Sequence, residues 1–259
     1  MDIPIWKKLV AEFIGTFALV FIGIGSIVAA GFAGAEGGAG LVTIALAHGL
    51  AIATMVTAVG HVSGGHFNPA VTVGAVVAKA ISVGQAAGYI VSQLVGATVA
   101  ATVIRVAVPT ELWQKVKLGT PMLAKEGTVI SFGQGVLIEA VLTFFLVWVV
   151  AAVAIDPKGA FGKVAGIPIG LVIAMDIMAG GPLTGASMNP ARTFGPALAG
   201  RYWADHLVYW LGPLLGGVLA AAIYKYGILG ISSSLSEERN YRDEDRGQRR
   251  SRQSRQRRR

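Results

Sequence analysis

Two segments of this chain decide its fold because they repeat one another: His66-Phe67-Asn68-Pro69-Ala70-Val71-Thr72-Val73-Gly74 and Ser187-Met188-Asn189-Pro190-Ala191-Arg192-Thr193-Phe194-Gly195. Each contains the tripeptide Asn-Pro-Ala, and the second asparagine follows the first by 121 positions. Each copy also lies in a hydrophobic half of the chain. This pattern indicates an internal duplication with a polar site at its centre of symmetry.

The composition indicates a membrane protein. Of the 259 residues, 54% are hydrophobic and only 14% are charged, whereas a soluble domain carries about 25% charged residues. The 35 glycines suit helices that approach one another closely in lipid. The chain has no cysteine, which excludes a disulfide framework and thiol chemistry.

Six apolar segments are long enough to cross a bilayer as helices, which takes about 20 residues. We expect these spans at about 9–31, 41–60, 84–108, 132–155, 166–182 and 205–228.

Two further apolar stretches, near 68–79 and 189–199, cover only half of the bilayer. Each begins with Asn-Pro, which is typical of a helix start with asparagine as the N-cap and proline at the first helical position. Both are predicted to be short helices that begin inside the membrane. Irregular backbone at that depth must line a water-filled cavity or be buried in protein.

Other residues of the first half recur in the second at a similar spacing. The pairs are Glu12 and Glu139, Thr16 and Thr143, and Tyr89 and Tyr209. Three spans per half is an odd number, so the second half must be inverted in the membrane. Inverted repeats bring their special segments together near the midplane. We therefore predict an all-α membrane protein with one repeat at about 5–108 and the other at about 132–228.

Much of the net charge of +8 lies at the C-terminal end. Residues 231–259 hold ten arginines and five acidic residues, and they lack any apolar period. We therefore expect a disordered Arg-rich tail that follows a channel domain at 1–230. A solvated extension and a contact with anionic lipid both fit this tail, and no nucleic-acid partner is expected.

The lysines near the N-terminus predict the orientation. Lys7 and Lys8 precede the first span, whereas the loop after it, at about 32–40, carries only Glu36 among charged residues. The positive-inside rule then places both termini in the cytoplasm, and we expect the plasma membrane. The three lysines of the loop at 109–131 fall on the other side and weaken this bias.

Three further motifs accompany the paired Asn-Pro-Ala boxes: Ala11-Glu12-Phe13-Ile14-Gly15-Thr16-Phe17, Ser63-Gly64-Gly65-His66 and Arg192-Thr193-Phe194-Gly195-Pro196. With these motifs, the chain resembles the aquaporin, or major intrinsic protein, family over about residues 5–230. This resemblance implies six transmembrane helices and two re-entrant half-helices in a right-handed bundle. It also implies a homotetramer with one pore in each monomer, and a channel without a cofactor.

The two boxes are expected to form the central constriction of the pore, with the residues Asn68, Pro69, Ala70, Asn189, Pro190 and Ala191. The side-chain amide of each asparagine can donate to a passing water molecule, and both half-helices point their positive ends at the same place. A water that accepts from both amides has both lone pairs engaged and cannot accept a hydrogen bond from its neighbours in the file. The channel should therefore conduct water while it excludes protons and ions.

The resemblance also implies an outer selectivity filter, which spacing from the boxes assigns to His48, Ile177, Ala186 and Arg192. An arginine inside a membrane protein is costly and marks a functional site; here it is expected to donate to water and repel cations. Taken alone, Arg192 could also be a structural partner, and His48 a packed core residue.

The filter differs from the family's water-only type, which has Phe in place of His48 and His in place of Ile177. Together with Ala179-Gly180-Gly181-Pro182, it resembles the plant tonoplast type. We expect a somewhat wider filter that passes ammonia, and urea is a further candidate.

Glu12 and Glu139 are expected to support the half-helices by accepting hydrogen bonds from loop N–H groups. A proton relay or a cation site is the alternative for such buried carboxylates. His66 is expected to line the cytoplasmic vestibule and His206 to lie at the outer membrane interface. Asp176 is expected to face protein.

Three other functions fit the sequence less well. Glycerol facilitators carry an Asp where this chain has Thr193, and they lack the pair Tyr209-Trp210. A secondary transporter is also built from inverted repeats, but it would need ion-coordinating groups at the helix breaks. An intramembrane enzyme or a metal site would need a catalytic or ligand motif, and no Ser/His/Asp set, H-E-x-x-H or cysteine cluster is evident.

Overall fold

The computed structural model describes residues 3–34, 38–125, 127, 129–159 and 162–229, and the predicted tail at 231–259 lies outside these residues. In the described part, six helices are long and apolar enough to cross a membrane. They are α1 (Ile5–Phe32), α2 (Gly38–Ser63), α4 (Val83–Ala107), α6 (Phe132–Val150), α7 (Gly166–Thr184) and α9 (Val208–Ile223). The six predicted spans are thereby confirmed.

The ends of the spans differ by a few residues from the prediction. α6 and α9 continue as π-helical turns over Ala151–Ile155 and Tyr224–Leu229. The last span begins three residues later than expected because residues 205–207 form a turn before α9. A short helix that the sequence did not predict, α5 (Thr110–Lys115), follows α4.

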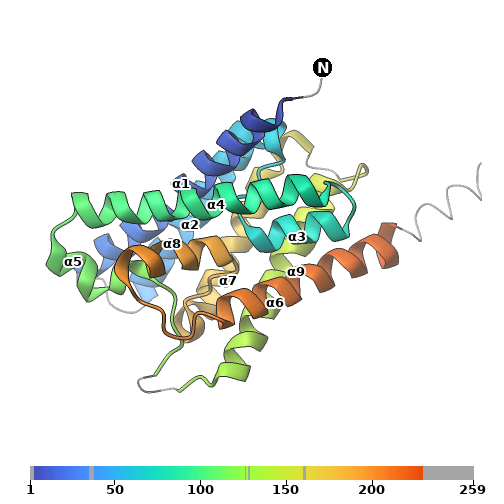
Figure 1. The fold of residues 1–259 in the computed structure, drawn as a ribbon. Helices are drawn as coiled ribbons and strands as arrows, with labels where there is room; N and C mark the ends of the chain where they lie inside the picture. The colour runs from blue at the N-terminus through green and yellow to red at the C-terminus, as the bar shows by residue number, and fades with distance from the viewer. Residues whose placement is uncertain (1–2, 35–37, 126, 128, 160–161, 230–259) are drawn as a thin grey trace, which may run out of the picture.

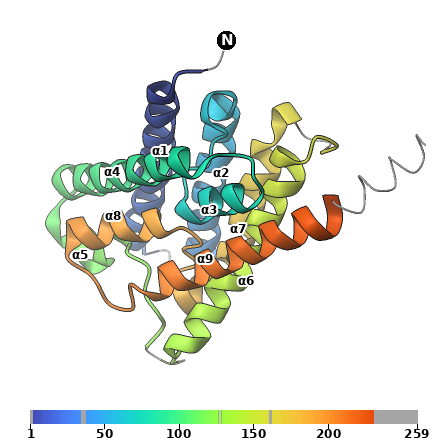
Figure 2. The same cartoon turned by 45° about the vertical axis from the view of Figure 1, so that its right-hand side comes forward.

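The two half-helices are present where the repeated boxes predict them. α3 (Pro69–Val77) and α8 (Pro190–Gly200) each begin at the proline of an Asn-Pro-Ala box. Figure 1 shows both between the long helices α4 and α9. Figure 2 shows the same arrangement after a turn of 45°. The fold of two repeats with three spans and one half-helix each is thus the predicted one.

The helix contacts of one half repeat in the other. α1 packs on α4 and α2 as α6 packs on α9 and α7. Each half-helix packs against the last span of the opposite half, α3 on α9 and α8 on α4. α2 and α7 cross at the centre, where Gly49 and Gly170 lie against each other's backbone. The two halves are therefore interlocked rather than merely adjacent.

Glycines at symmetric positions allow the closest of these approaches. A Cβ atom on Gly96 of α4 would lie 2.6 Å from the carbonyl oxygen of Phe13 on α1. A Cβ atom on Gly216 of α9 would meet the carbonyl oxygen of Ala140 on α6 even more closely. Backbone atoms cannot rotate away as side chains do, so any larger residue must separate the helices.

Replacing Gly216 with leucine should therefore force α9 away from α6. We expect a loss of at least about 3 kcal/mol in stability, the upper range for overpacked sites, and a lower thermal unfolding temperature in detergent. Gly84→Leu is the control because a Cβ there meets nothing within 4 Å. Equal unfolding temperatures for the two variants would contradict the proposed contact.

Candidate functional site

Each half-helix begins with a side-chain cap near the centre of the molecule. Oδ1 of Asn68 accepts the backbone N–H of Ala70 at 2.8 Å. Oδ1 of Asn189 accepts the N–H groups of Ala191 at 3.0 Å and Arg192 at 3.2 Å. The proline between cap and helix has no N–H to satisfy. The predicted capping is thereby confirmed for both asparagines.

The amide nitrogens of the same two side chains reach across to the opposite half. Nδ2 of Asn68 donates to the carbonyl of Met188 at 2.8 Å, and Nδ2 of Asn189 donates to the carbonyl of Phe67 at 2.9 Å. Phe67 and Met188 have φ values of 48° and 54°, in the left-handed region that residues with a Cβ rarely adopt. Since an amide NH2 has two donors, each asparagine keeps one N–H beyond this contact.

Glu12 holds the loop that leads into α3. The carboxylate is fully buried. Oε1 accepts from the hydroxyl of Ser63 at 2.6 Å and the N–H of His66 at 3.0 Å. Oε2 accepts from the N–H of Phe67 and the side-chain amide of Gln93, both at 2.7 Å. One carboxylate thus gathers four donors and fixes the backbone in front of Asn68.

Glu139 does the same for the loop that leads into α8. Oε1 accepts from the hydroxyl of Thr184 at 2.7 Å and the N–H of Ser187 at 2.9 Å. Oε2 accepts from the N–H of Met188 at 2.7 Å. The second half has Pro213 in place of Gln93, and proline offers no donor. The loop contacts that the sequence predicts are therefore present in both halves, with three donors here instead of four.

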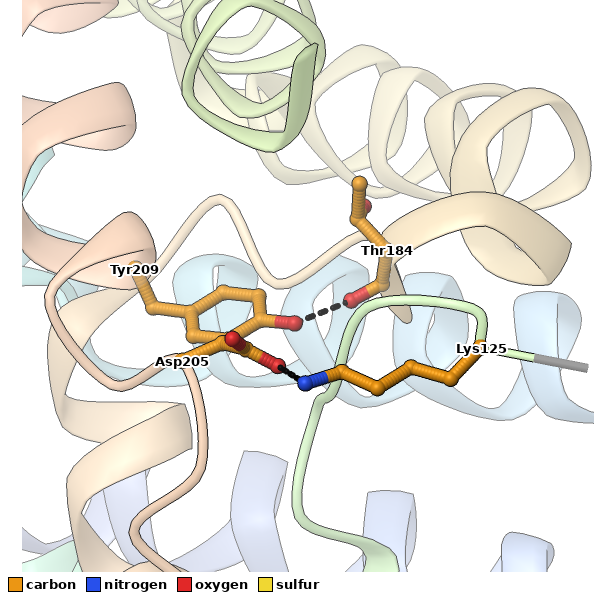
Figure 3. A network of polar contacts seen from close by, with 4 residues as sticks. All are labelled: Lys125, Thr184, Asp205 and Tyr209. Carbon is orange, nitrogen blue, oxygen red and sulfur yellow. Dashed lines mark hydrogen bonds and ion pairs between the residues drawn. The ribbon is translucent and has the colours of Figure 1, made fainter. Parts of the chain in front are cut away.

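Two buried tyrosines repeat the symmetry at the starts of these loops. The hydroxyl of Tyr89 donates to the carbonyl of Ser63 at 2.7 Å. The hydroxyl of Tyr209 donates to the carbonyl of Thr184 at 2.8 Å (Figure 3). The repeat of the two tyrosines is visible in the sequence, whereas their acceptors were not predicted. Ser63 and Thr184 are themselves 121 positions apart, the spacing of the two asparagines, and this signal could have identified them.

The end of the segment 120–125 is tied to the turn before α9 by an ion pair that the sequence did not predict. Nζ of Lys125 lies 3.0 Å from Oδ2 of Asp205 (Figure 3). The backbone N–H of Ala124 donates to the carbonyl of Leu183 at the end of α7, at 2.9 Å. Lys125 is exposed, so the ion pair itself contributes only about 0–1 kcal/mol. It orients the loop more than it stabilises the fold.

His48 and Arg192 meet at the predicted filter. Nδ1 of His48 lies 2.8 Å from the carbonyl of Ile44, which can only accept, so Nδ1 carries the proton of the neutral ring. Nε2 can then accept from Nη2 of Arg192, which lies 3.4 Å away. Nη1 of Arg192 is buried and has no partner among the described residues. The imidazole fits because Gly23 has no side chain; a Cβ there would overlap the ring.

A cavity of about 550 Å³ joins these parts. Both asparagine caps line it, together with all four predicted filter residues, His48, Ile177, Ala186 and Arg192. His66, the predicted vestibule residue, also lines it, as do Lys8 and His61 at the end near the N-terminus. The structure therefore brings the two asparagines, the filter residues and the vestibule residue together along one space. The other predicted constriction residues, Pro69, Ala70, Pro190 and Ala191, are not among the residues that line it.

Two titratable residues noted in the sequence lie elsewhere. Asp176 is buried on α7 and is not among the residues that line the cavity. His206 is half-buried against the rings of Phe194 and Trp203, and its Nε2 accepts from the indole N–H of Trp210 at 3.1 Å. Burial lowers the pKa of His206, which favours the neutral ring that this hydrogen bond requires.

No group of three or more His, Asp or Glu residues in the described ranges is placed to hold a metal ion. The carboxylate oxygens of Glu12 and Glu139 already accept from protein donors. What the geometry offers instead is a cavity lined by the amides of Asn68 and Asn189 and by Arg192, donors that protein contacts hold in position.

The two buried carboxylates can be tested with isosteric amides. In Glu139→Gln, the NH2 group must face a backbone N–H of either Ser187 or Met188, so one donor is left unsatisfied. We expect a loss of about 1–3 kcal/mol in thermal unfolding, with reduced water permeability, and a similar loss in Glu12→Gln. Glu111→Gln, at an exposed position on α5, is the control. Variants of Glu12 and Glu139 that behave like this control would refute the supporting role.

Comparison with known proteins agrees with this geometry. The sequence profile of the family described as "Major intrinsic protein" matches residues 1–224. "Aquaporin TIP4-4" of Zea mays is 45% identical over 221 residues, which cover 84% of this chain and 85% of the relative. "Probable aquaporin TIP3-2" of Arabidopsis thaliana is 46% identical over 236 residues, which cover 86% and 84%.

A solved structure shares the fold. The X-ray structure of the aquaglyceroporin from Plasmodium falciparum matches with a TM-score of 0.74 at 23% identity, over 88% of this chain and 98% of that chain. At this identity the match supports the architecture alone. Profile, relatives and helix arrangement lead to one conclusion: the chain is a multi-pass membrane protein that belongs to the major intrinsic protein family.

Proposed function

We propose that the chain is a passive channel that conducts water, with ammonia as a second permeant, and that it excludes protons and other ions. The observation that carries this proposal is that both asparagine caps and the His48–Arg192 pair line the same cavity. The aquaporin names of the relatives, at 45% and 46% identity, support the same activity.

Proton exclusion follows from the crossed asparagines. One N–H of each amide is held by the carbonyl of Met188 or Phe67, so the amide cannot rotate freely. The other N–H of each side chain donates to a water molecule in the constriction. A water that accepts twice has both lone pairs engaged, and its own hydrogens point away from the file's centre. Proton transfer through this point is interrupted.

The half-helices add an electrostatic barrier at the same point. α3 and α8 both begin there, and each helix N-terminus carries about half a positive charge. A neutral solute passes this region at little cost, whereas a cation is repelled after losing much of its hydration shell. Arg192 places a full positive charge farther along the cavity and repeats the exclusion.

The composition of the filter sets the choice among neutral solutes. Arg192 supplies a buried Nη1 donor without a protein partner in the described part, and Nδ1 of His48 is occupied by the carbonyl of Ile44. Ile177 and Ala186 add apolar surface and no hydrogen-bonding side chain. Water and ammonia need only one or two contacts at a time, so both fit this filter. Ammonium carries a charge that Arg192 repels.

A facilitator for glycerol or urea is the second candidate, and it shares the fold of the solved aquaglyceroporin. The filter argues against glycerol as a main substrate. Glycerol needs several hydrogen-bonding partners at once, and the two side chains Ile177 and Ala186 offer none. A coupled transporter is less consistent still, because amides and an arginine line the break where ion-coordinating oxygens would be required.

We also propose that the protein assembles as a homotetramer with both termini in the cytoplasm. The family resemblance supports the tetramer, and the lysines at positions 7 and 8 support the orientation. The plasma membrane, which we expected from the sequence, has no support among relatives that carry TIP names.

One stopped-flow series in proteoliposomes tests the proposal. Water and ammonia fluxes should exceed those of empty vesicles, while glycerol flux stays near the empty-vesicle level. Ile177→His should retain water flux and lower ammonia flux severalfold, because the larger polar ring narrows the filter and adds a donor. Absence of ammonia flux in the wild-type protein would refute the second permeant. Absence of water flux would refute the channel itself.

A further inference from the structure

Both half-helices end in the same way, at the ends that lie away from the two central asparagines. A basic residue with a left-handed backbone follows each helix, Lys79 with φ 59° and Arg201 with φ 62°. The next residue closes the turn by a hydrogen bond back into the helix, from Ala80 to Ala75 at 2.8 Å and from Tyr202 to Ala197 at 3.1 Å. This type of ending satisfies only some of the four terminal carbonyls of a helix.

A cation from the opposite half satisfies one of the remaining carbonyls at each end. Nζ of Lys225, at the end of the last span, donates to the carbonyl of Ala78 at 2.6 Å. Nη1 of Arg105, at the end of α4, donates to the carbonyl of Ala199 at 2.8 Å. Lys225 follows Arg105 by 120 positions and Ala199 follows Ala78 by 121. These contacts therefore obey the same pseudo-two-fold symmetry as the asparagines.

Aromatic rings hold both cations near these carbonyls. The guanidinium of Arg105 lies 5.7 Å from the ring centre of Trp113, which is buried on α5. The ammonium of Lys225 lies 5.8 Å from the ring centre of Tyr226. Such contacts contribute about 0.5–1 kcal/mol at exposed sites. Each side chain thus has two partners that keep it at the helix end, which a freely solvated basic residue would lack.

A charge at the C-terminal end of a half-helix changes the electrostatic potential at its N-terminal end. The C-terminus of a helix carries about half a negative charge, which partly cancels the positive potential of its N-terminus. A helix of 11 residues, as α8 is, is only about 16 Å long. Within a membrane protein the low dielectric lets charges act over that distance. A cation bound at the outer end therefore raises the potential that a permeating cation meets at the constriction.

We propose that Arg105 and Lys225 are positioning residues of the ion barrier: each clamps the outer end of the opposite repeat's half-helix and offsets its negative pole. Each half-helix is then held by the opposite repeat at both ends, by an asparagine contact at its start and by a cation at its end. The inference rests on the proposed proton exclusion at the constriction.

The test compares proton conductance with water permeability in the same proteoliposomes. Arg105→Met and Lys225→Met should each raise the ratio of proton conductance to water permeability about two- to fivefold, the effect of one unit charge acting over about 16 Å at an effective dielectric of about 20 to 40. Arg105→Lys and Lys225→Arg should restore the wild-type ratio, since both keep a charged donor. The thermal unfolding temperature of every variant shows whether a change in the ratio comes from a destabilised fold.

Two exposed lysines provide matched controls. Lys115 lies on the same side as Arg105, at the end of α5, and Lys158 lies beside Asp156, which binds the hydroxyl of Tyr224 near Lys225. Lys115→Met removes one positive charge near Arg105, and Lys158→Met removes one near Lys225. Neither substitution affects a contact with a half-helix carbonyl. Both should leave the ratio unchanged, and an equal rise in these controls would overturn the proposal.

The remaining outcomes are also decisive. An unchanged ratio in folded Arg105→Met and Lys225→Met would overturn the inference. Where a methionine variant does not fold, Arg105→Gln and Lys225→Gln keep a neutral donor; a raised ratio then supports the proposal and a wild-type ratio refutes it. A wild-type protein that itself conducts protons would instead refute the proposed function, so the two failures can be told apart.

Discussion

The rest of the structure depends on the exchange of hydrogen bonds between two asparagine side chains and the loops that face them. Each side chain caps its own half-helix through Oδ1 and holds the carbonyl before the other cap through Nδ2. The two half-helices therefore cannot move apart without breaking the hydrogen bonds that Nδ2 of each asparagine makes with the opposite half. This exchange fixes both asparagine side chains in the wall of the cavity and leaves one N–H on each for a passing solute.

The surrounding structure holds these exchanged hydrogen bonds in place, and this costs free energy in backbone conformation and in buried carboxylates. Phe67 and Met188 adopt left-handed backbone conformations, and two carboxylates are buried away from water. A buried charge is tolerated only where hydrogen bonds replace its hydration. Glu12 and Glu139 meet that condition with donors from the same loops that carry the strained residues. Gly15 on α1 leaves room for the loop in front of α3, because a Cβ on Gly15 would overlap the ring of Phe67.

Much of the fold could be predicted from the sequence because internal repeats and runs of apolar residues indicate it directly. The six apolar spans, the two Asn-Pro helix starts and the paired carboxylates follow from length, capping chemistry and spacing. The filter residues were found by resemblance rather than by physics; a lone histidine such as His48 has no periodic signal. The crossed bonds from Asn68 and Asn189, the ion pair of Lys125 with Asp205 and the clamps of Arg105 and Lys225 join residues distant in the chain. Local patterns do not encode such pairings, which appear only once the helices are packed.

The central claim is that the amide donors at the midplane exclude cations, and Asn68→Asp tests it most directly. Aspartate can still accept the N–H of Ala70 and cap α3, but it cannot donate to Met188 or to water, and it adds a negative charge. Under voltage clamp, the account predicts a cation conductance that the wild-type protein lacks, with water permeability retained. Cation exclusion equal to that of the wild-type protein, in a folded and water-permeable variant, would contradict the account.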